Sequence, residues 1–583
     1  MIDKNKYTHS LEYKDIKRGE QCQVACPLGI DMPNYYNLME KERYEDAYLL
    51  LKHANPFPSI TGRVCFAPCE DYCVRGKLDT SIAIRDVEYY LTDYIQTGPN
   101  AKPELALYKK GSLLGTRKES VAIIGSGPAG MSAAWDLAHF GYKVTIYEKF
   151  PACGGMAHLG VPVHKIMREV FDYEFEVLKK LGVTIVNNVE VGKDITIDTI
   201  KKQGVSAICI AVGADVGNKL TIPGEENCDG VIESTEVLRL VRLGSREKLG
   251  NNIIIIGGGN TAIDISRTCR RLGAKNVIVI YRRKREDMPA YDYEIDAALE
   301  EGVKFQFQLA PKKVEAKNGK LVGLWFLRTN HAGSAEGKSV QTSGSSHSDV
   351  LLEANAVILA ISQKPNLALL GDKESLITSE KGLIKQKMEK GIQNLPGIFA
   401  AGDVITGPRS IVVASASGRK AALHMDAYIR NIEAAQEKKD PVVTSMGPPV
   451  KLNFEELKRQ KAHKKVLLKI EGNFDVLAEN FTHNQAKEEA DRCFRCNQNI
   501  EIDASGCIKC NYCVDVCPVD CLVMVNENNE IFGHESELKD GLFGTAVMIK
   551  DALCIRCALC VEICPSYVVS FKGCEITEKV YKE

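Results

Sequence analysis

The chain has 583 residues, a formal net charge of −1 and 45% hydrophobic residues. This length suits about four domains of roughly 150 residues each, and the balanced charge argues against nucleic acid or a membrane surface as a partner. The sequence has no apolar run near the ~18 residues of a membrane span, and its start lacks the apolar core of a signal peptide. We therefore expect a cytoplasmic protein without a membrane span.

Cysteine is frequent, with 21 residues gathered mainly towards the two ends of the chain. Without an export signal, this number indicates metal ligation in a reducing compartment rather than disulfides. The N-terminal cysteines lie among helical stretches such as Asn34 to His53, and those four residues apart would share one helix face. They are Cys22, Cys26, Cys65, Cys69 and Cys73. The pattern fits a small helical domain that holds iron–sulfur clusters; zinc and buried free thiols are the alternatives.

A strand, a glycine turn, a helix and a second strand are predicted between Val121 and Glu148. The turn has the GxGxxG form, with Gly125 for the tight turn, Gly127 for close approach to a pyrophosphate and Gly130 for helix–strand packing. The helix N-terminus would face the phosphates, and Glu148 can bind a ribose hydroxyl. The stretch predicts a dinucleotide site, and the alternative is an ordinary βαβ turn.

A second motif of this kind follows an apolar strand at 251–256. Its residues are Gly257, Gly259, Asn260, Thr261 and Ala262, the last replacing a glycine whose packing role alanine also fills. The next strand ends at Arg282 and Arg283 instead of an acid. Because guanidinium groups attract a 2′-phosphate, the sequence favours NADP(H) over NAD(H). The alternative is that Arg282 to Arg285 form a solvated charged face.

Later residues extend the first site. Gly155 belongs to a glycine pair that follows Glu148, and a buried strand ends at Gly402 and Asp403, just before a long helix. Asp403 can accept a hydrogen bond from a flavin ribityl hydroxyl. The first dinucleotide domain is therefore expected to be split, with the second inserted into it. Cys153 has no CxxC partner, which argues against a redox disulfide beside the flavin.

The C-terminal end carries two cysteine runs of the bacterial ferredoxin form, each CxxCxxCxxxCP. Since the fourth cysteine of each run ligates the other cluster, we expect two [4Fe–4S] sites with crossed ligands. One site would use Cys507, Cys510, Cys513 and Cys564, and the other Cys554, Cys557, Cys560 and Cys517. The stretch between Cys517 and Cys554 is long enough for an extra hairpin. A flavin can link two-electron hydride transfer to one-electron clusters without an acid–base residue, so no catalytic side chain is predicted.

The glycine motifs resemble those of two-dinucleotide-binding-domain flavoproteins, and they stand in the same order: Gly125 to Gly130, Gly154-Gly155, Gly257 to Ala262 and Gly402-Asp403. Cys26-Pro27, GRVC at Gly62 to Cys65 and the arginine pair after the second glycine loop narrow the resemblance. The relatives are the glutamate synthase small subunit, the N-terminal half of dihydropyrimidine dehydrogenase and the large subunit of NADH-dependent ferredoxin:NADP oxidoreductase. The resemblance covers residues of about 15 to 430. It implies FAD in the first domain, NAD(P)H in the second, two [4Fe–4S] clusters in the helical cap, and thus about four clusters in all. It also implies that Glu88 completes a cluster held by Cys26, Cys65 and Cys69.

The sequence departs from these relatives at one place. They carry another CxxC just before the position of Cys22, whereas here a similar stretch, AKEEADRCFRCNQ, stands far downstream. Our hypothesis is that the two ends share one cluster, bound by Cys22, Cys73, Cys493 and Cys496. The alternative is that the downstream pair forms a separate zinc or iron site.

The expected fold is multidomain α/β, with two Rossmann-like domains. The predicted segments are a helical iron–sulfur domain at 1–117, an FAD-binding domain at 118–237 and 363–432, an NAD(P)-binding domain at 238–362, a helical linker at 433–500 and a 2[4Fe–4S] ferredoxin-like α+β domain at 501–583.

The resemblance implies an oxidoreductase that moves electrons between NAD(P)H, FAD and clusters, to or from ferredoxin or another redox subunit of a hetero-oligomer. An electron-bifurcating transhydrogenase-type complex is one form of this. The alternatives are an electron-input subunit of a glutamate synthase-like or other reductase complex, and a non-enzymatic electron-transfer or assembly subunit. The intact glycine loops argue against the last alternative.

Overall fold

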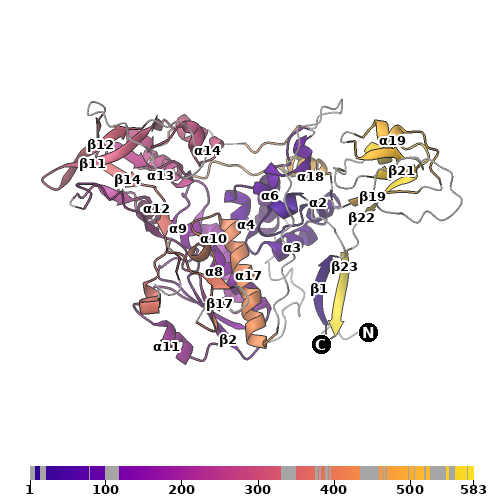
Figure 1. Cartoon of the computed structure of the whole chain (residues 1–583), viewed down its shortest axis with the longest axis horizontal. Coiled ribbons are helices and arrows are strands. Elements are labelled where there is room, and N and C mark those ends of the chain that lie inside the picture. The colour runs from indigo at the N-terminus through magenta and orange to yellow at the C-terminus, as the bar shows by residue number, and fades with distance from the viewer. Residues whose placement is uncertain are drawn as a thin grey trace. The chain divides into compact units, whose positions relative to one another are not determined.

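The structure is a computed structural model that divides into two compact units (Figure 1). One comprises Met1–Leu114, Gln436–His463 and Asn480–Glu583, and we call it the end unit because it contains both ends of the chain. The other, the central unit, comprises Gly115–Ala435 and Lys464–Glu479. The described residues are 7–13, 21–77, 79–98, 117–226, 228–329, 349–373, 378–379, 382–387, 391–392, 395–432, 458–463, 465, 469–494, 496, 498–503, 506–517, 520–525, 546–549, 554, 559–573 and 576–582.

The first sheet of the central unit is parallel, with the strand order β18-β5-β2-β3-β4. Its strands are β2 (Ser120–Ile124), β3 (Lys143–Tyr147), β4 (Thr184–Val186), β5 (Ala207–Ile210) and β18 (Ile398–Ala400). Its helices are α8 (Pro128–His139), α9 (Gly155–Leu159), α10 (Arg168–Lys180), α11 (Ile197–Lys202), α16 (Asp403–Thr406) and α17 (Ile411–Arg430). Strands β2 and β5 are continuous apolar runs, as befits strands buried on both faces.

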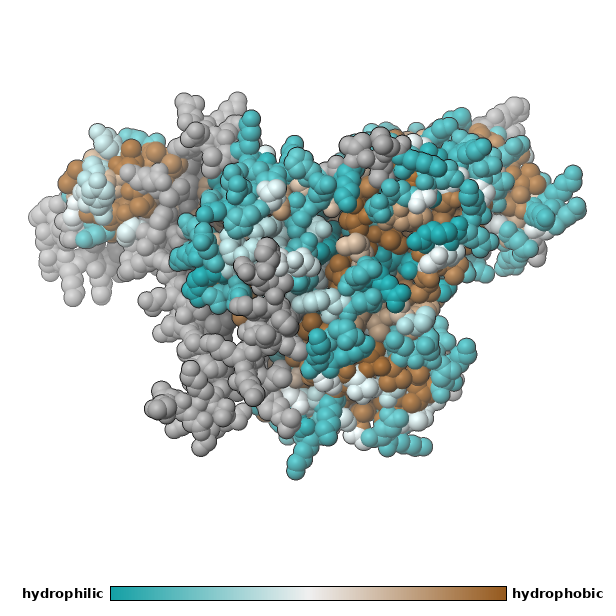
Figure 2. Space-filling model, turned by 180° about the vertical axis from the view of Figure 1, so that it is seen from behind, coloured by the Kyte–Doolittle hydropathy of each residue, from teal (hydrophilic) through white to brown (hydrophobic). Residues whose placement is uncertain are grey.

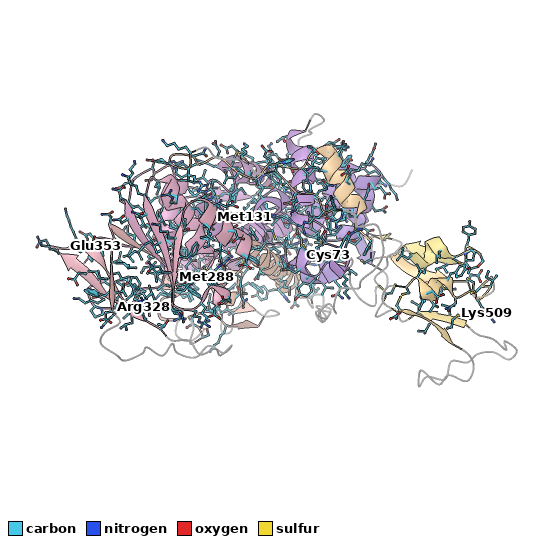
Figure 3. All side chains as sticks on the ribbon, turned by 90° about the horizontal axis from the view of Figure 1, so that it is seen from above. Cys73, Met131, Met288, Arg328, Glu353 and Lys509 are labelled. Atoms are coloured by element: carbon cyan, nitrogen blue, oxygen red, sulfur yellow. The ribbon has the colours of Figure 1, made fainter. Side chains whose placement is uncertain are left out.

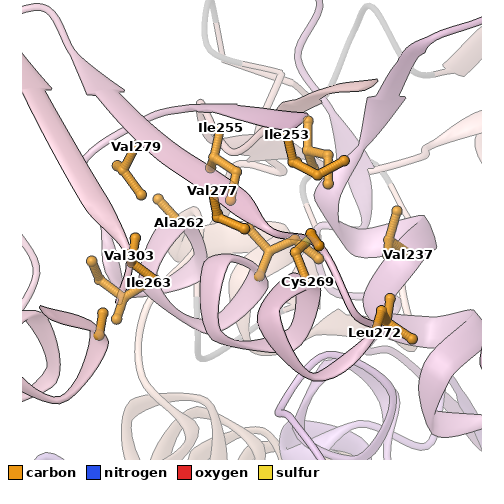
Figure 4. Packing of buried hydrophobic residues seen from close by; sticks show 14 of the residues in the cluster. Val237, Ile253, Ile255, Ala262, Ile263, Cys269, Leu272, Val277, Val279 and Val303 are labelled. Carbon is orange, nitrogen blue, oxygen red and sulfur yellow. The ribbon is translucent and has the colours of Figure 1, made fainter. Parts of the chain in front are cut away.

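The second sheet is also parallel, in the order β10-β9-β8-β14-β7. Its strands are β7 (Val231–Glu233), β8 (Asn252–Ile256), β9 (Asn276–Tyr281), β10 (Lys304–Phe307) and β14 (Ala356–Leu359), and its helices are α12 (Ser234–Arg242), α13 (Asn260–Arg271) and α14 (Asp292–Glu300). Figure 4 shows the apolar side chains of β8 and β9 packed against α13, with Cys269 among them as a core residue. All these strands lie in sequence between β5 and β18, so the second sheet is formed by a segment inserted between strands of the first.

Smaller elements complete the central unit. An antiparallel sheet contains β11 (Leu309–Lys317), β12 (Lys320–Arg328) and β13 (Val350–Glu353). The short elements are β6 (Val216–Gly217), β15 (Gln363–Lys364), β16 (Gln386–Lys387), β17 (Gly391–Ile392), η3 (Arg285–Asp287) and η4 (Ala368–Lys373). The polar stretch between β12 and β13 lies almost wholly outside the described residues. Residues 469–479, here called the strap, return to this unit late in the chain, and Phe474 packs against the core of the second sheet.

The N-terminal part of the end unit is a helical cap, as predicted. Its elements are α1 (Gln21–Ala25), α2 (Met32–Glu40), α3 (Tyr44–Ala54), α4 (Pro58–Val64), α5 (Pro68–Asp71), η2 (Val74–Lys77) and α6 (Ile84–Thr97). Two helical expectations were wrong. The stretch 34–53 is broken into α2 and α3, with Glu42 at φ 58°, and Cys65 and Cys69 flank a turn at Ala67 (φ 50°) instead of sharing one helix face.

A helix from the far end of the chain, α18 (His483–Asp491), packs against α2 and α6 of the cap. The ferredoxin-like part, here called the ferredoxin module, follows with β19 (Gln498–Ile502), α19 (Tyr512–Asp515), β20 (Leu522–Val525), β21 (Ala546–Ile549), α20 (Leu559–Ile563) and β22 (Val569–Gly573). The antiparallel pair β20–β21 lies within the stretch expected to hold an extra hairpin. Finally, β1 (Tyr7–Tyr13) pairs with β23 (Ile576–Lys582), which joins the two ends of the chain.

In Figure 3, the labelled Cys73 belongs to the cap and Lys509 to the ferredoxin module. On the face shown in Figure 2, apolar side chains gather on this module. Its exposed apolar residues include Ile508 and Tyr567. Within the described part of the chain, no helix combines the length and the apolar character needed to cross a membrane.

Candidate active site

A cavity of about 600 Å³ runs along the first glycine loop of the central unit. The predicted residues Gly125, Gly127, Gly155, Gly402 and Asp403 line it, together with Glu148. They come from the ends of β2, β3 and β18, where the carboxyl ends of parallel strands meet, which is where ligands bind in such sheets. Gly130, the remaining predicted glycine, lies in the first turn of α8, where a Cβ would be 2.0 Å from Gly125 O.

The glycines keep this cavity open because side chains would fill it. A Cβ on Gly155 would lie 2.8 Å from Gly127 Cα, and Gly155 has φ +52°. A Cβ on Gly402 would lie 2.8 Å from Ala129 Cβ, with φ +79°. A backbone that close leaves room for a flat or extended ligand against the start of α8, whose free N–H groups favour a phosphate.

Glu148 is fastened to the glycine loop. Its Oε2 accepts hydrogen bonds from Ser126 N (2.9 Å) and Ser126 Oγ (2.6 Å), and its Oε1 accepts one from Phe150 N (2.9 Å). The residue is 4% exposed. The carboxylate is thus held in one orientation at the end of β3, where a ribose hydroxyl would reach it. Ser126 was not predicted as a site residue, because its place in the motif accepts any side chain.

Asp403 begins α16 at the other side of the cavity. Burial raises the pKa of its carboxyl to about 6, against a lowering effect of Arg409, whose N–H donates to Oδ1 (3.2 Å). The preceding Gly402 N donates to Ser417 Oγ of α17 (2.9 Å), which fixes the turn. A half-buried acceptor at the cavity wall suits a hydroxyl donor from a ligand.

The second glycine loop repeats this geometry between β8 and α13. Gly257 has φ +146°, and a Cβ there would lie 2.3 Å from Ala360 O. A Cβ on Gly259 would meet nothing within 4 Å, so the loop faces open space at this point. Asn260 and Thr261 begin α13, and Ala262 is fully buried against the sheet, which agrees with its predicted packing role.

The arginines after β9 differ from one another in their partners. Arg285 forms ion pairs with Asp292 (3.2 Å) and Asp296 (3.5 Å). Among the described residues, Arg282 and Arg283 have no carboxylate within ion-pair distance, and Arg283 Nε is buried without a hydrogen-bond partner. Two guanidinium groups without carboxylate partners at the end of this strand fit an anionic group such as a 2′-phosphate.

In the cap, four cysteines from both ends of the chain line one small cavity of about 20 Å³: Cys22, Cys73, Cys493 and Cys496. Burial raises the pKa of the Cys22 thiol well above its usual range, and Cys496, Cys73 and Cys493 raise it further. Four thiols around one small cavity, of which Cys73 is buried and the others are half-buried, need a cation to compensate them when ionised, which fits an iron–sulfur cluster. Cys22 and Cys73 lie more than four hundred residues before Cys493 and Cys496 in the sequence.

A second group in the cap joins Cys26, Cys65, Cys69 and Glu88. Burial raises the pKa of Cys65 to about 12. The hydrogen bond from Ala67 N–H lowers this pKa, and the charges of Glu88 and Cys26 raise it. Burial raises the pKa of Glu88 to about 7; both of its hydrogen bonds, from Asn55 Nδ2 (2.9 Å) and from Thr61 Oγ1, are accepted by Oε1. A buried carboxyl beside three cysteines is a suitable fourth ligand.

Charged residues fasten the downstream segment onto the cap. Glu489 Oε1 accepts from Ala83 N (2.8 Å) and pairs with Arg492 (2.7 Å). Arg492 in turn donates to Thr80 O (2.6 Å) and pairs with Asp79 (3.0 Å). Glu489 and Arg492 are almost wholly buried. This anchor, which we call the Arg492 clamp, immediately precedes Cys493 and was not predicted from the sequence.

In the ferredoxin module, one small cavity is lined by Cys507, Cys510, Cys513 and Cys564, which belong to two different runs. Cys517 of the first run lies 3.3 Å from Cys521 Sγ to Sγ, and hydrogen bonding with Cys517 and Cys554 raises the pKa of Cys521. This arrangement agrees with crossed ligation, in which Cys517 joins Cys554 of the second run. Cys560 is buried in the module core, and Cys557 lies outside the described residues.

No three His, Cys, Asp or Glu side chains in the described ranges converge as they would on a single metal ion. The cysteine groups are arranged around cavities instead.

Three family models match consecutive parts of the chain. Residues 119–418 match the pyridine nucleotide-disulphide oxidoreductase model. The chain belongs to this family. Residues 15–99 match the dihydropyrimidine dehydrogenase domain II model with its 4Fe-4S cluster, and residues 506–568 match a 4Fe-4S dicluster domain. The chain is therefore an iron–sulfur flavoprotein oxidoreductase that acts on a nicotinamide nucleotide, as the motifs predicted.

Curated relatives of this oxidoreductase include proteins described as subunits. It is 32% identical to the NADP(+)-dependent formate dehydrogenase subunit beta of Moorella thermoacetica, over 82% of this chain and 70% of that protein. It is 30% identical to the NADPH-Fe(3+) oxidoreductase subunit beta of Geobacter sulfurreducens, over 82% and 75%. It is 32% identical to the glutamate synthase [NADPH] small chain of Azospirillum brasilense, over 70% and 86%.

The family's name refers to a disulphide, and Cys153 is the cysteine near the first glycine loop. Its Sγ donates to Asn187 Oδ1 (3.0 Å), and burial, followed by the charge of Glu148, raises its pKa to about 11. A thiol that stays protonated and hydrogen-bonded is a poor nucleophile.

Proposed function

We propose that this chain takes electrons from NADPH into FAD and distributes them singly to [4Fe–4S] clusters, as a subunit of a larger redox assembly. FAD, when bound, accepts the two electrons of a hydride and releases them one at a time. The residues of the first glycine loop, Glu148 and Asp403 would hold it in the cavity along β2. The segments predicted from the sequence, including the split FAD domain, are part of this proposal.

The preference for NADPH is supported by one observation above all. Arg282 and Arg283 have no carboxylate partner among the described residues, whereas their neighbour Arg285 has two. An acid at this strand end would repel a 2′-phosphate, while free guanidinium groups bind it. Two of the relatives named above carry NADPH in their names and one carries NADP(+), which supports the same assignment.

Anaerobic titration of the purified chain with NADPH, and separately with NADH, tests this proposal. We expect NADPH to bleach the flavin absorbance at concentrations at least ~10-fold below those needed with NADH. If neither nucleotide bleaches the flavin, the chain does not accept hydride and the proposal fails. If both act equally, the arginines do not select NADPH.

We further propose four clusters with the following ligands: Cys22, Cys73, Cys493 and Cys496 for the first; Cys26, Cys65, Cys69 and Glu88 for the second; Cys507, Cys510, Cys513 and Cys564 for the third; and Cys517, Cys554, Cys557 and Cys560 for the fourth. The shared cavity of the first set, with the Arg492 clamp beside it, supports its assignment to one cluster. The electron path would then connect the central unit to ferredoxin or a partner subunit through the end unit.

Iron counting in serine variants tests the shared cluster. Replacing Cys493 and Cys496 should remove the iron of one cluster, and replacing Cys22 and Cys73 should remove the same amount. Replacing all four should remove no more, because one cluster is lost in each case. Cys228→Ser, at a half-buried cysteine of the central unit, is the control. Additive iron loss in the fourfold variant would show that the two ends hold separate centres.

The partner is proposed as another redox protein that receives electrons from the ferredoxin module. The relatives described as subunits support a hetero-oligomer. Electron bifurcation stays a prediction of the sequence resemblance alone, since it depends on flavin potentials. Comparing ferredoxin reduction with and without NAD⁺ as a second acceptor would test it.

A further inference from the structure

A line of buried charges crosses the central unit. Lys165 Nζ lies 2.6 Å from Asp264 Oδ1 and 2.6 Å from Glu294 Oε1. Arg267 continues the line, 3.2 Å from Glu294 and 2.8 Å from Glu301. Arg271 closes it with a further hydrogen bond to Glu301 (2.8 Å). These charges alternate in sign, so each carboxylate has a cation beside it.

The line joins two parts of the fold. Lys165 belongs to the connector between α9 and α10, which follows β3 of the first sheet. Asp264 lies on α13 and Glu294 on α14, both of which pack against the second sheet. Lys165 is therefore the cation that the FAD-binding part contributes to a network otherwise built from the nucleotide-binding part.

The two carboxylates are tied to the second glycine loop. Asp264 stands one turn after Asn260, the first residue of α13. Asn260 Oδ1 accepts a hydrogen bond from Tyr291 N (3.2 Å) at the start of α14, and Gly258 O accepts one from Ala290 N (3.1 Å). A shift of Asp264 and Glu294 would therefore shift the loop that faces the dinucleotide phosphates.

The strap makes backbone hydrogen bonds to both of the parts that this charge network joins. Gly472 N donates to Arg271 O (2.8 Å), at the far end of α13. Leu477 N donates to His164 O (3.4 Å), next to Lys165. The strap thus holds the residue beside Lys165 and the last residue of α13 with one short segment.

We propose that Lys165 is a positioning residue for hydride transfer: its ammonium holds α13 and α14, and with them the second glycine loop, in register with the FAD cavity. This inference rests on the proposed function. Hydride transfer needs the reacting atoms within a near-attack distance, and a misplacement of about 1 Å can slow a reaction ~100-fold. Lys165 is suited to this role because one ammonium contacts a carboxylate on each of the two helices.

The competing explanation is that Lys165 only balances buried charge. Removing one partner of a buried pair leaves a charge uncompensated, which destabilises a protein without any special role in catalysis. The two explanations differ for a variant that removes Lys165 and one carboxylate together. Charge balance is then kept, since Glu294 retains Arg267, but the contact between the two parts is lost.

The test compares four variants of the full chain: Lys165→Met, Lys165→Arg, the double variant Lys165→Met with Asp264→Asn, and Lys179→Met. The last removes an exposed lysine of the same unit, paired with Glu176 at 2.7 Å, and serves as the control. For each we would measure FAD content, thermal midpoint, the dissociation constant of NADP⁺, the single-turnover rate of flavin reduction at saturating NADPH, and the long-wavelength absorbance that arises when a nicotinamide stacks on flavin.

We expect flavin reduction to slow by roughly 10- to 100-fold in Lys165→Met and in the double variant. The NADP⁺ dissociation constant and FAD content should stay within about threefold of the unaltered chain, and the stacking absorbance should fall. The double variant should recover thermal stability without recovering the rate. Lys165→Arg should keep most of the rate, and Lys179→Met all of it.

A double variant that regains both stability and rate would overturn the proposal and leave Lys165 a charge-balancing residue. Unchanged flavin reduction in Lys165→Met would overturn it directly. If Lys165→Met loses FAD, the charge-balanced double variant decides in its place. These outcomes are distinct from failure of the proposed function, in which NADPH would not bleach the flavin of the unaltered chain at all.

Discussion

The two glycine loops of the central unit have nearly the same backbone and different side chains at the next strand end. Gly125 N donates to Tyr147 O (2.8 Å), and Gly257 N donates to Ile280 O (3.1 Å), in both cases the last or second-last residue of the neighbouring strand. A Cβ on Gly125 would lie 2.4 Å from Ala211 O, and one on Gly257 2.3 Å from Ala360 O. The same local constraint therefore shapes both loops.

The difference begins after β3 and β9. At the first site, Glu148 is buried and receives three hydrogen bonds that fix its orientation. At the second, Arg282 is exposed and neither it nor Arg283 has a carboxylate partner in the described residues. We infer that the first loop is organised in advance for a resident cofactor, while the second leaves its charged groups available for a nucleotide that binds and leaves.

The largest effect should come from filling the first loop. Gly155→Ala places a Cβ 2.8 Å from Gly127 Cα, and such overpacking costs about 1–3 kcal/mol. We expect FAD affinity to fall by up to ~100-fold, measured by flavin fluorescence. Gly204→Ala is the matched control, because Gly204 also has positive φ (+83°) but open space around it. Equal flavin loss in both variants would mean that backbone strain, not the cavity, is responsible.

A somewhat smaller effect should follow from removing the arginines of the second loop. Replacing Arg282 and Arg283 with glutamine removes two ionic contacts to the 2′-phosphate, worth about 1 kcal/mol each because solvent screens them. We expect NADPH to lose roughly 30-fold in kcat/KM for flavin reduction, with NADH little changed. Arg285→Gln, which loses a guanidinium already paired with Asp292 and Asp296, should change the NADPH preference less than threefold. A uniform loss for both nucleotides would contradict the assignment.

Weakening the hydrogen bonds of Glu148 should moderately lower FAD affinity at the first site and leave the second site unchanged. In Glu148→Gln, only one of the two terminal atoms can still accept, so the hydrogen bonds from Ser126 and the one from Phe150 N to the other oxygen cannot all be kept. We expect FAD to bind about 10-fold more weakly. Ser126→Ala, which removes only the Oγ hydrogen bond, should lose less. If Ser126→Ala were the more damaging change, the carboxylate would not be the organising group.

The smallest effect is a pH dependence at Asp403, whose pKa burial raises to about 6 in the flavin-free chain. A ligand hydroxyl that donates to this carboxyl favours its ionised form, so FAD should bind about fourfold more weakly at pH 5.5 than at pH 7.5. Asp403→Asn should remove that difference. In the flavin-free chain the folded state holds the proton more tightly than the unfolded state, so Asp403 should lower stability as pH rises from about 4 through 6. Equal pH dependence in both proteins would rule out this role.

Local patterns were sufficient for the central unit. The apolar runs of β2 and β8, each followed by a glycine motif and a helix, predict the βαβ geometry because turn, helix and strand are all encoded within about thirty residues. The inserted second sheet also followed from sequence order. The crossed cysteines of the ferredoxin module were predictable because metal ligation fixes the spacing within each run.

Contacts between distant segments were harder to predict. The resemblance to relatives led to the pairing of Cys22 with Cys493, but nothing in the local sequence indicated the Arg492 clamp, since Asp79 and Thr80 are far away in the chain. The start of α18 was readable, because Thr482 and Gln485 form a capping box. The sequence of the strap has no recognisable periodicity. Its position depends on the contact of Phe474 with a core whose residues lie far earlier in the chain.

Because α18 packs on the cap, the cap can be completed only late in the synthesis of the chain. Helices α2 and α6 leave the ribosome early, but the surface that α18 covers stays open until the residues of the whole central unit have been added. At about 5–20 residues per second this delay is roughly 20–80 s. The cap helices are thus made before the central unit, and the cap is completed after it. During that interval its cysteines would be accessible to whatever delivers iron and sulfur.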